Sequence, residues 1–271
     1  MDELLYVLQR LSVLNRDNGS AFTNTQRLDA IASLLSDSPY HRIEAKGLFH
    51  LYGQKSVSKL KGPVVIVSSH VDCESHITRC FASLKDKNTL LGTFDNSITN
   101  AAIVSLMRSI KLPENVFVAF TGDEEENGRG AKDLIRFIRK KHLDVVNITV
   151  LDVTEEGWKT NADFTVENDF WDEEIGEAVV ALVEKTGYRW NFVPGELDDI
   201  PDYIPKNRVI HVEAYDDESW DYDEKDLPCF SFCLPSSGEM HSDDGILVRT
   251  DSFRRYTEVL GRILKEISLY F

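Results

Sequence analysis

The sequence predicts an α/β fold, specifically a three-layer α/β/α sandwich around a mixed, mostly parallel central sheet. Short apolar runs that are typical of buried strands alternate along the chain with longer segments whose apolar residues recur at helical spacing. The chain has 271 residues, of which 42% are hydrophobic, enough for one large core. No linker rich in Pro, Gly or Ser interrupts the alternation, so residues 1–271 are expected to form a single domain.

Helices are expected where Leu, Val and Ile recur every three or four positions. In chain order, the segments with this pattern are 2–14, 25–36, 98–110, 131–141, 172–186 and 250–271. Either Asn24 or Thr25 stands where it could cap the second helix, and Gly187 stands where the fifth is expected to end.

Strands are expected where shorter apolar or alternating runs are bounded by turn residues. These segments are 41–52, 63–70, a stretch near Leu90, 117–121, 145–152, 208–214 and 228–234. The segment 214–226 is dense in acidic and aromatic residues. It is predicted to be an exposed loop, with a rim or lid over a site as the alternative.

The net charge of −16 argues against two classes of partner. Nucleic acid and anionic membrane surfaces both attract Lys and Arg, which Asp and Glu outnumber in this chain. No apolar run approaches the ~18 residues of a membrane span. The first residues form an amphipathic pattern with early acids rather than a basic signal peptide. A cytoplasmic protein is therefore expected.

The four cysteines are Cys73, Cys80, Cys229 and Cys233, too few for a disulfide scaffold. Cys229 and Cys233 are four apart on an expected strand and would face one side, but a cytoplasmic protein favours free thiols. Cys73 is expected to be a buried spectator, with a soft extra metal ligand or an oxidation-sensitive neighbour of the site as the alternatives.

A histidine and an acid lie at the end of the expected strand 63–70. His70 and Asp72 have i, i+2 spacing, which places both side chains on one side of an extended chain. A carboxylate beside an imidazole fixes its tautomer and strengthens it as a metal ligand. The pattern alone favours a hydrogen-bonded core histidine, and a metal ligand is the alternative.

Acids recur where other strands end. Residues 123–126 form an acidic turn between an expected strand and a helix, and Asp152 ends the strand 145–152. Four adjacent carboxylates repel each other unless a cation is present, although a solvated acidic turn is the alternative. Asp95 precedes an expected helix, where it could also be an N-cap. His241 lies in a long turn after the last strand.

These side chains are expected to meet, because the carboxyl ends of parallel strands form one edge of a sheet, where ligands bind. The candidates are His70, Asp95, Glu124, Glu125, Asp152 and His241. Two imidazoles and four carboxylates suit Zn²⁺, with Mn²⁺ or Co²⁺ as substitutes. They are too many for one tetrahedral ion, but they fit two ions that share a bridging carboxylate and leave one acid as an unligated base.

The order of these motifs resembles that of the di-zinc exopeptidase superfamily. The matching motifs are His-x-Asp, Asp-Asn before a helix, Gly-Asp-Glu-Glu followed by Arg-Gly-Ala, Asp-Val-Thr, and His-Ser. This superfamily comprises cocatalytic zinc aminopeptidases, carboxypeptidases and related deacylases on a phosphorylase/hydrolase-like α/β/α fold. The resemblance extends over most of the chain.

The resemblance implies a role for each candidate. The implied roles are Asp95 as the bridge between two ions, His70 with Asp152 at one ion, Glu125 with His241 at the other, Glu124 as the general base, and Asp72 as the residue that orients His70.

The spacing of the motifs resembles that of the compact, single-domain aminopeptidases. Only 24 residues separate His70 from Asp95, and 88 separate Asp152 from His241. These intervals leave little room for the dimerisation or lid domain that other branches insert, so no inserted domain is expected.

The resemblance implies a di-zinc aminopeptidase that cleaves N-terminal residues from short peptides by means of a metal-bridging water, with Glu124 as general base. The alternatives within the superfamily are a carboxypeptidase and an N-acyl amino acid deacylase, for which Arg129 and Arg249 are the candidates to hold a substrate carboxylate. Alternatives of another class are a single-zinc glutaminyl cyclase and a non-catalytic binding module. The sequence indicates neither the preferred side chain nor the oligomeric state.

Overall fold

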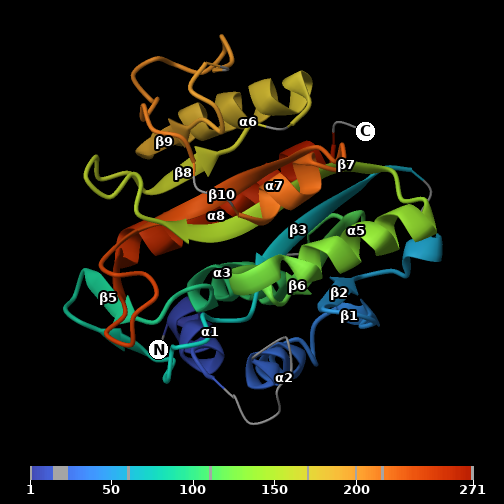
Figure 1. Cartoon of the computed structure of the whole chain (residues 1–271), viewed down its shortest axis with the longest axis horizontal. Helices are drawn as coiled ribbons and strands as arrows, with labels where there is room; N and C mark the ends of the chain where they lie inside the picture. Colours follow the sequence, from blue (N-terminus) through green and yellow to red (C-terminus); the bar gives the residue numbers. More distant parts are fainter. Residues whose placement is uncertain are drawn as a thin grey trace.

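In the computed structural model, a mixed sheet runs through the whole width of the protein (Figure 1). The residues that the structure describes are 2–14, 24–59, 62–109, 112–169, 171–198, 200–214 and 217–269. The last residues of the expected helices 98–110 and 250–271 lie outside these ranges.

Parallel pairing occupies the centre of the sheet, and antiparallel pairing extends it on both sides. The main path runs β1 (His41–Glu44), β2 (Phe49–Gly53), β6 (Val116–Thr121), β3 (Val64–His70), β7 (Val145–Thr154), β10 (Cys229–Ser237), β11 (Ile246–Arg249), β5 (Thr89–Gly92) and β4 (Ala82–Leu84). Strands β6, β3, β7 and β10 are parallel to their neighbours in this group. β8 (Phe164–Glu167) pairs antiparallel with β10 and parallel with β9 (Trp190–Val193). The predicted mixed sheet is therefore confirmed.

Helices cover both faces of the sheet, as the sequence predicts. The helices are α1 (Glu3–Leu11), α2 (Thr25–Leu34), α3 (Ser97–Ser109), α4 (Glu124–Asn127), α5 (Arg129–Lys141), α6 (Glu173–Thr186), α7 (Glu218–Asp223) and α8 (Thr250–Ile267), with a 3₁₀ turn, η1 (Val57–Lys59). Successive residues of β3 face opposite layers. Val65 and Val67 join the core cluster that includes residues of α3 and α8. Val64 and Ile66 join the cluster that includes residues of α5 and α7.

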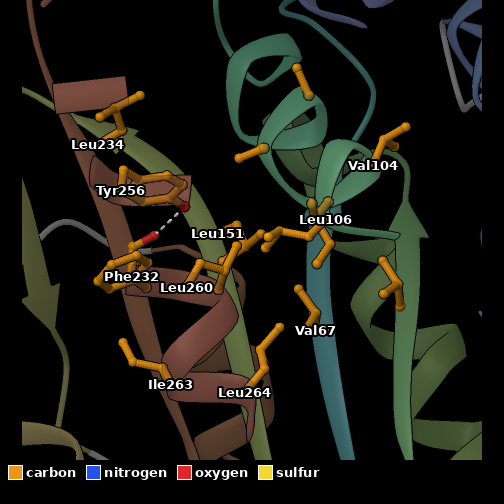
Figure 2. Close-up of a cluster of buried hydrophobic side chains, with 14 of the residues drawn as sticks. Val67, Val104, Leu106, Leu151, Phe232, Leu234, Tyr256, Leu260, Ile263 and Leu264 are labelled. Atoms are coloured by element: carbon orange, nitrogen blue, oxygen red, sulfur yellow. Dashed lines mark hydrogen bonds between the residues drawn. The ribbon is translucent and has the colours of Figure 1, made fainter. Parts of the chain in front are cut away.

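Helix α8 packs directly on the central strands. Figure 2 shows Val67 of β3, Leu151 of β7 and Phe232 of β10 among the apolar side chains that α8 faces. Tyr256 of α8 stacks on Phe232 with ring centroids 4.6 Å apart. Its hydroxyl donates a hydrogen bond of 2.8 Å to the carbonyl oxygen of Phe232. This contact fixes α8 against β10, the strand that leads into the loop carrying His241.

Two expectations about strands need correction. The segment 41–52 forms two strands rather than one, because Gly47 turns the chain with a positive φ of 88°. The expected strand 208–214 is wrong. Within this described segment, Val209 makes an isolated bridge to Phe192, and Val212 is 40% exposed. The segment therefore does not form a strand, because its ladder pairing with β9 is limited to the bridge of Val209.

The acidic and aromatic segment also differs from its prediction. Residues 217–223 form the N-cap and body of α7 instead of an exposed loop. Glu218 and Tyr222 are buried, and both bond to the hydroxyl of Ser68 on β3, at 2.6 and 2.8 Å. α7 is therefore part of the layer that covers β3.

Gly130 lets α5 begin directly against the end of β6. A Cβ atom at this position would lie 2.6 Å from the backbone nitrogen and oxygen of Gly122 and 2.8 Å from the carbonyl oxygen of Leu48. The backbone N–H of Gly130 instead donates to the Gly122 carbonyl at 3.0 Å. This close approach holds the acidic turn, residues 123–126, between β6 and α5.

None of the described helices combines the length and the apolarity that crossing a bilayer requires. In the structure all four cysteines are free thiols.

Candidate metal centre

The six predicted candidates converge at the carboxyl edge of the parallel strands. His70 ends β3, Asp152 lies near the end of β7, and the acidic turn after β6 supplies residues 124 and 125. Asp95 immediately precedes Asn96 and α3, and His241 lies in the loop between β10 and β11. One cavity of about 450 Å³ is lined by all six side chains.

Asp95 lies between the two histidines. Its Oδ1 is 3.0 Å from Nε2 of His70, and its Oδ2 is 3.2 Å from Nε2 of His241. His70 Nε2 is also 3.7 Å from Oδ1 of Asp152, and His241 Nε2 is 3.3 Å from Oε2 of Glu125. Two ligands of one tetrahedral zinc ion are about 3.3 Å apart, because each lies about 2.0 Å from the metal. The spacing therefore fits two neighbouring ions with Asp95 between them.

Unsatisfied polar atoms give an independent test of whether a metal fits. Among the described residues, the buried atoms Asp95 Oδ1 and Glu125 Oε1 have no hydrogen-bond partner. Buried carboxylate oxygens are normally bonded, so such atoms in a site call for an ion. Two groups have ligand atoms within 4.8 Å of one another: His70 with Asp95 and Glu125, and Glu74 with Glu125 and His241. The residues present are thus consistent with a dinuclear metal site.

Three further acids of the cavity were not among the predicted site residues, although the segment 214–226, which contains Asp217, had a rim over a site as its alternative prediction. Glu74 Oε1 is 3.9 Å from Nδ1 of His241, and its place two residues after Asp72 was the available signal. Glu167 of β8 and Asp217, the N-cap of α7, also line the cavity. Their position depends on β8 and α7, neither of which the sequence predicted.

Polar contacts hold the ligand segments in place. Asp72 Oδ1 is 3.3 Å from Nδ1 of His70, and its Oδ2 accepts a hydrogen bond of 3.3 Å from the backbone N–H of Glu125. Asn100 of α3 donates from Nδ2 to the carbonyl oxygen of His70 at 2.8 Å. Asp72 thus connects the ends of β3 and β6, and Asn100 connects β3 to the helix that follows Asp95.

The pKa values of the buried carboxylates in the site are shifted from their usual values. Burial, with the negative charge of Asp95, raises the pKa of Glu125 to about 10. Burial raises the pKa of Asp152 to about 6 and that of Glu124 well above its usual value. Burial also acts to raise the pKa of Asp95, but the neighbouring imidazoles of His241 and His70 hold it well below its usual range. A bound divalent cation would favour the ionised form of each carboxylate.

The rest of the cavity wall is acidic and apolar. Beyond the six candidates it contains Glu74, Glu126, Val153, Thr154, Glu155, Glu167, Asp217, Cys233 and Met240. Among the described residues, none that lines this cavity is Lys or Arg. Arg129 pairs with Asp123 at 2.8 Å, and Arg249 lies over the ring of Trp158 at 3.7 Å. Neither arginine belongs to the cavity wall.

Comparisons with known proteins identify the fold. No family model matches this sequence, and no curated protein matches it. Among solved structures, the chain is similar to an aminopeptidase from the archaeon Desulfurococcus kamchatkensis, with a TM-score of 0.70 and 11% identity over 97% of this chain and 94% of that one. It is also similar to a TET aminopeptidase from a marine sediment archaeon of the Thaumarchaeota, with a TM-score of 0.70 and 10% identity over 100% and 98% of the two chains.

Aminopeptidase PepT from Bacillus cereus gives a third match, with a TM-score of 0.69 and 10% identity over 98% of both chains. At these identities the similarity establishes the fold. The chain has the α/β/α fold of these aminopeptidases, and the expected resemblance to the zinc exopeptidases is confirmed for the fold.

Proposed function

We propose that this protein is a metal-dependent aminopeptidase that removes N-terminal residues from short peptides. The single observation that carries the proposal is the position of Asp95 between two histidines, with Glu124 beside them. Glu124 Oε2 is 3.9 Å from Nε2 of His70, and Glu124, like Asp152, belongs to neither group of clustered ligand atoms. We assign Asp152 to the ion at His70 and Glu124 to proton transfer, which gives two adjacent places for a divalent ion and one unligated carboxylate.

The proposed metal is Zn²⁺, with Mn²⁺ or Co²⁺ as substitutes, since the donors are imidazole nitrogens and carboxylate oxygens. The proposed ligands are His70 and Asp152 at one ion, Glu125 and His241 at the other, and Asp95 at both. When bound, the two ions supply Lewis acidity toward the scissile carbonyl group and toward water. Asp72 keeps the His70 ring in the orientation in which Nε2 faces the site.

Glu124 is the proposed general base and acid. Its carboxylate accepts the proton of the attacking water at one Oε atom and then donates that proton to the leaving amine. Burial, which raises the pKa of Glu124, supports this role because the group must hold the proton between the two transfers. Proton transfer by a positioned carboxylate contributes roughly 10²–10⁴-fold to a rate.

The cavity wall supports an aminopeptidase over a carboxypeptidase or a deacylase. Acidic residues such as Glu155 and Asp217 attract a protonated amino terminus. A substrate carboxylate would need a cationic partner, and the described lining residues include neither Lys nor Arg. The proposed compartment is the cytoplasm, which the four free cysteines support.

Substitution of Glu124 tests the proposal. In the zinc-loaded protein, Glu124→Gln should reduce hydrolysis of aminoacyl substrates by roughly 10²–10⁴-fold, while metal analysis still finds about two ions per chain. Glu177→Gln is the control, because Glu177 is an exposed acid of α6 that does not line the cavity, and it should keep most of the activity. Normal turnover by Glu124→Gln would contradict the assigned role.

A substrate screen separates the other candidate functions. Hydrolysis of aminoacyl and of N-acyl amino acid substrates is measured with each added metal and with a chelator. Hydrolysis only of N-acyl amino acids would replace the aminopeptidase by a deacylase. One ion per chain would favour a glutaminyl cyclase, and no bound ion would favour a binding module.

A further inference from the structure

Two thiols lie together behind the candidate metal centre. Cys73 Sγ is 3.6 Å from Cys80 Sγ and 3.7 Å from the carbonyl oxygen of Asp95. Cys73 is 5% exposed, whereas Cys80 is half-buried and can be reached from solvent. The proposed peptidase mechanism uses neither thiol.

A buried arginine contacts both sulfur atoms. Arg27 of α2 is fully buried, and its Nη2 lies 3.5 Å from Cys73 Sγ and 3.8 Å from Cys80 Sγ. The hydrogen bond with Cys73, followed by the positive charge of Arg27 and against the effect of burial, lowers the pKa of the Cys80 thiol to about 6. A thiolate beside a cation and next to a second thiol is the usual setting of an oxidation-sensitive cysteine pair.

The segment that carries both thiols also supports the loop of His241. Residues 71–81 form neither helix nor strand. His76 Nε2 is 2.7 Å from the carbonyl oxygen of His241, and the backbone N–H of Thr78 donates to Asp243 Oδ1 at 2.7 Å. Arg79 Nε donates to the carbonyl oxygen of Asp243 at 3.0 Å. A change in the path of residues 73–80 is therefore transmitted to His241.

We propose that Cys73 and Cys80 form a peroxide-sensitive dithiol, and that its oxidation to a disulfide weakens metal binding at His241. An S–S bond is about 2.05 Å long, so the two sulfurs must approach by about 1.5 Å. The irregular segment between them can supply this movement. Formation of the disulfide would break the hydrogen bonds between Arg27 and the two sulfur atoms. It would also change the path of residues 73–80 and therefore their contacts with the loop of His241. The effect on metal binding rests on the proposed metal site, whereas formation of the disulfide does not.

The oxidation needs one molecule of hydrogen peroxide. The Cys80 thiolate attacks one peroxide oxygen, so that an S–O bond forms while the O–O bond breaks, which leaves a sulfenic acid on Cys80 and a hydroxide ion. The sulfur of Cys73 then attacks the sulfur of Cys80, and an S–S bond forms while the S–O bond breaks. The departing hydroxyl takes the proton of Cys73 and leaves as water. The two thiols lose two electrons in total, and the peroxide is reduced to two waters once the first hydroxide takes up the proton that Cys80 had released.

Peptide mapping tests the disulfide without any need for peptidase activity. Trypsin cuts after Arg79, which separates fragment 62–79 from fragment 80–85. After treatment of the full chain with peroxide, a non-reducing digest should contain these two fragments joined, two hydrogens lighter than their sum, and dithiothreitol should separate them. Cys80→Ser should yield no joined fragment, whereas Cys229→Ser, which changes a buried thiol away from the pair, should still yield it. An intact wild type without the joined fragment would overturn the proposal.

Zinc titration tests the effect on metal binding. The peroxide-treated wild type should bind its second equivalent of zinc roughly 10–100-fold more weakly than the reduced protein, the usual cost of disturbing the residues that support a ligand. Dithiothreitol should restore the affinity, and Cys80→Ser should bind zinc equally before and after peroxide. Equal binding by the disulfide and dithiol forms of the wild type would overturn the link to His241. If the joined fragment forms but no preparation hydrolyses peptides, the proposed function fails and the dithiol assignment stands.

Discussion

At the scale of single residues, the two oxygens of Asp95 face different histidines, which lie 171 positions apart in the chain. Each proposed ion then shares this carboxylate with the other. The loss of the side chain would remove one ligand from each place and would also leave the two histidines without their nearest anionic partner.

Asp95→Ala should therefore lose both ions, as measured by metal analysis after dialysis against zinc-free buffer. The control is Asp123→Asn, because Asp123 is a nearby buried acid that pairs with Arg129 and belongs to neither ligand group. This control should keep about two ions per chain. Retention of both ions by a folded Asp95→Ala protein would rule out the bridging role.

The candidate site was largely predictable at this scale, for a physical reason. His70 and Asp152 lie at or near the ends of apolar strands, and Glu124 lies in the turn after one, so a strand pattern in the sequence also places their side chains at the sheet edge. Glu167 and Asp217 carry no such signal. They reach the cavity through tertiary packing of β8 and α7, which a local pattern does not encode.

At the scale of secondary-structure elements, the contact between α8 and β10 joins the closing helix to the strand before the His241 loop. Tyr256 contributes both ring stacking and a hydrogen bond to the Phe232 carbonyl. Phenylalanine at this position would keep the stacking and remove only the hydrogen bond.

Tyr256→Phe should lower the free energy of unfolding by about 0.5–1.5 kcal/mol, the usual net value of one buried hydrogen bond. Urea unfolding followed by circular dichroism measures the change. Tyr188→Phe is the control, since the hydroxyl of Tyr188 bonds to Glu258 at the surface and its loss should change the stability much less. Equal effects of the two substitutions would show that the buried hydrogen bond contributes little.

Helices were easier to predict than strands and short elements. The long helices have three- and four-residue periodicity along their whole length, and Asn24 caps α2 by accepting a hydrogen bond from the backbone N–H of Arg27, as the sequence suggested. Two strands appear where one was expected, because a single glycine, Gly47, adopts a left-handed conformation. α7 has only six residues, and its burial depends on Ser68 of a distant strand.

At the scale of the whole molecule, the acids of the site add to an already negative chain. The net charge is −16, and several carboxylates at the sheet edge are buried close together. Their mutual repulsion is present only in the folded state, where the sheet assembles them. A cation that binds the folded site relieves this repulsion and therefore stabilises the fold.

Removal of metal should lower the melting temperature, and added zinc should raise it again. At a free zinc concentration about 100 times the dissociation constant, the expected increase is roughly 5–10 °C for each ion bound to a chain of this size. Mg²⁺ serves as the control, because it prefers oxygen ligands in octahedral geometry and should stabilise the protein much less. Equal melting temperatures with zinc and with chelator would argue against a metal bound by the folded site.

The short helix α7 has a consequence for how such a protein diversifies. Its N-cap residue, Asp217, lines the cavity, but the segment supplies none of the six proposed metal-site residues. The hydrogen bond between Glu218 and Ser68 of β3 holds the helix in place beside the site. Substitution of Asp217 can therefore change which molecules the cavity admits, while the six proposed metal-site residues stay as they are. Natural variation and laboratory evolution can therefore alter substrate selectivity in this segment without altering the residues proposed to bind metal and transfer protons.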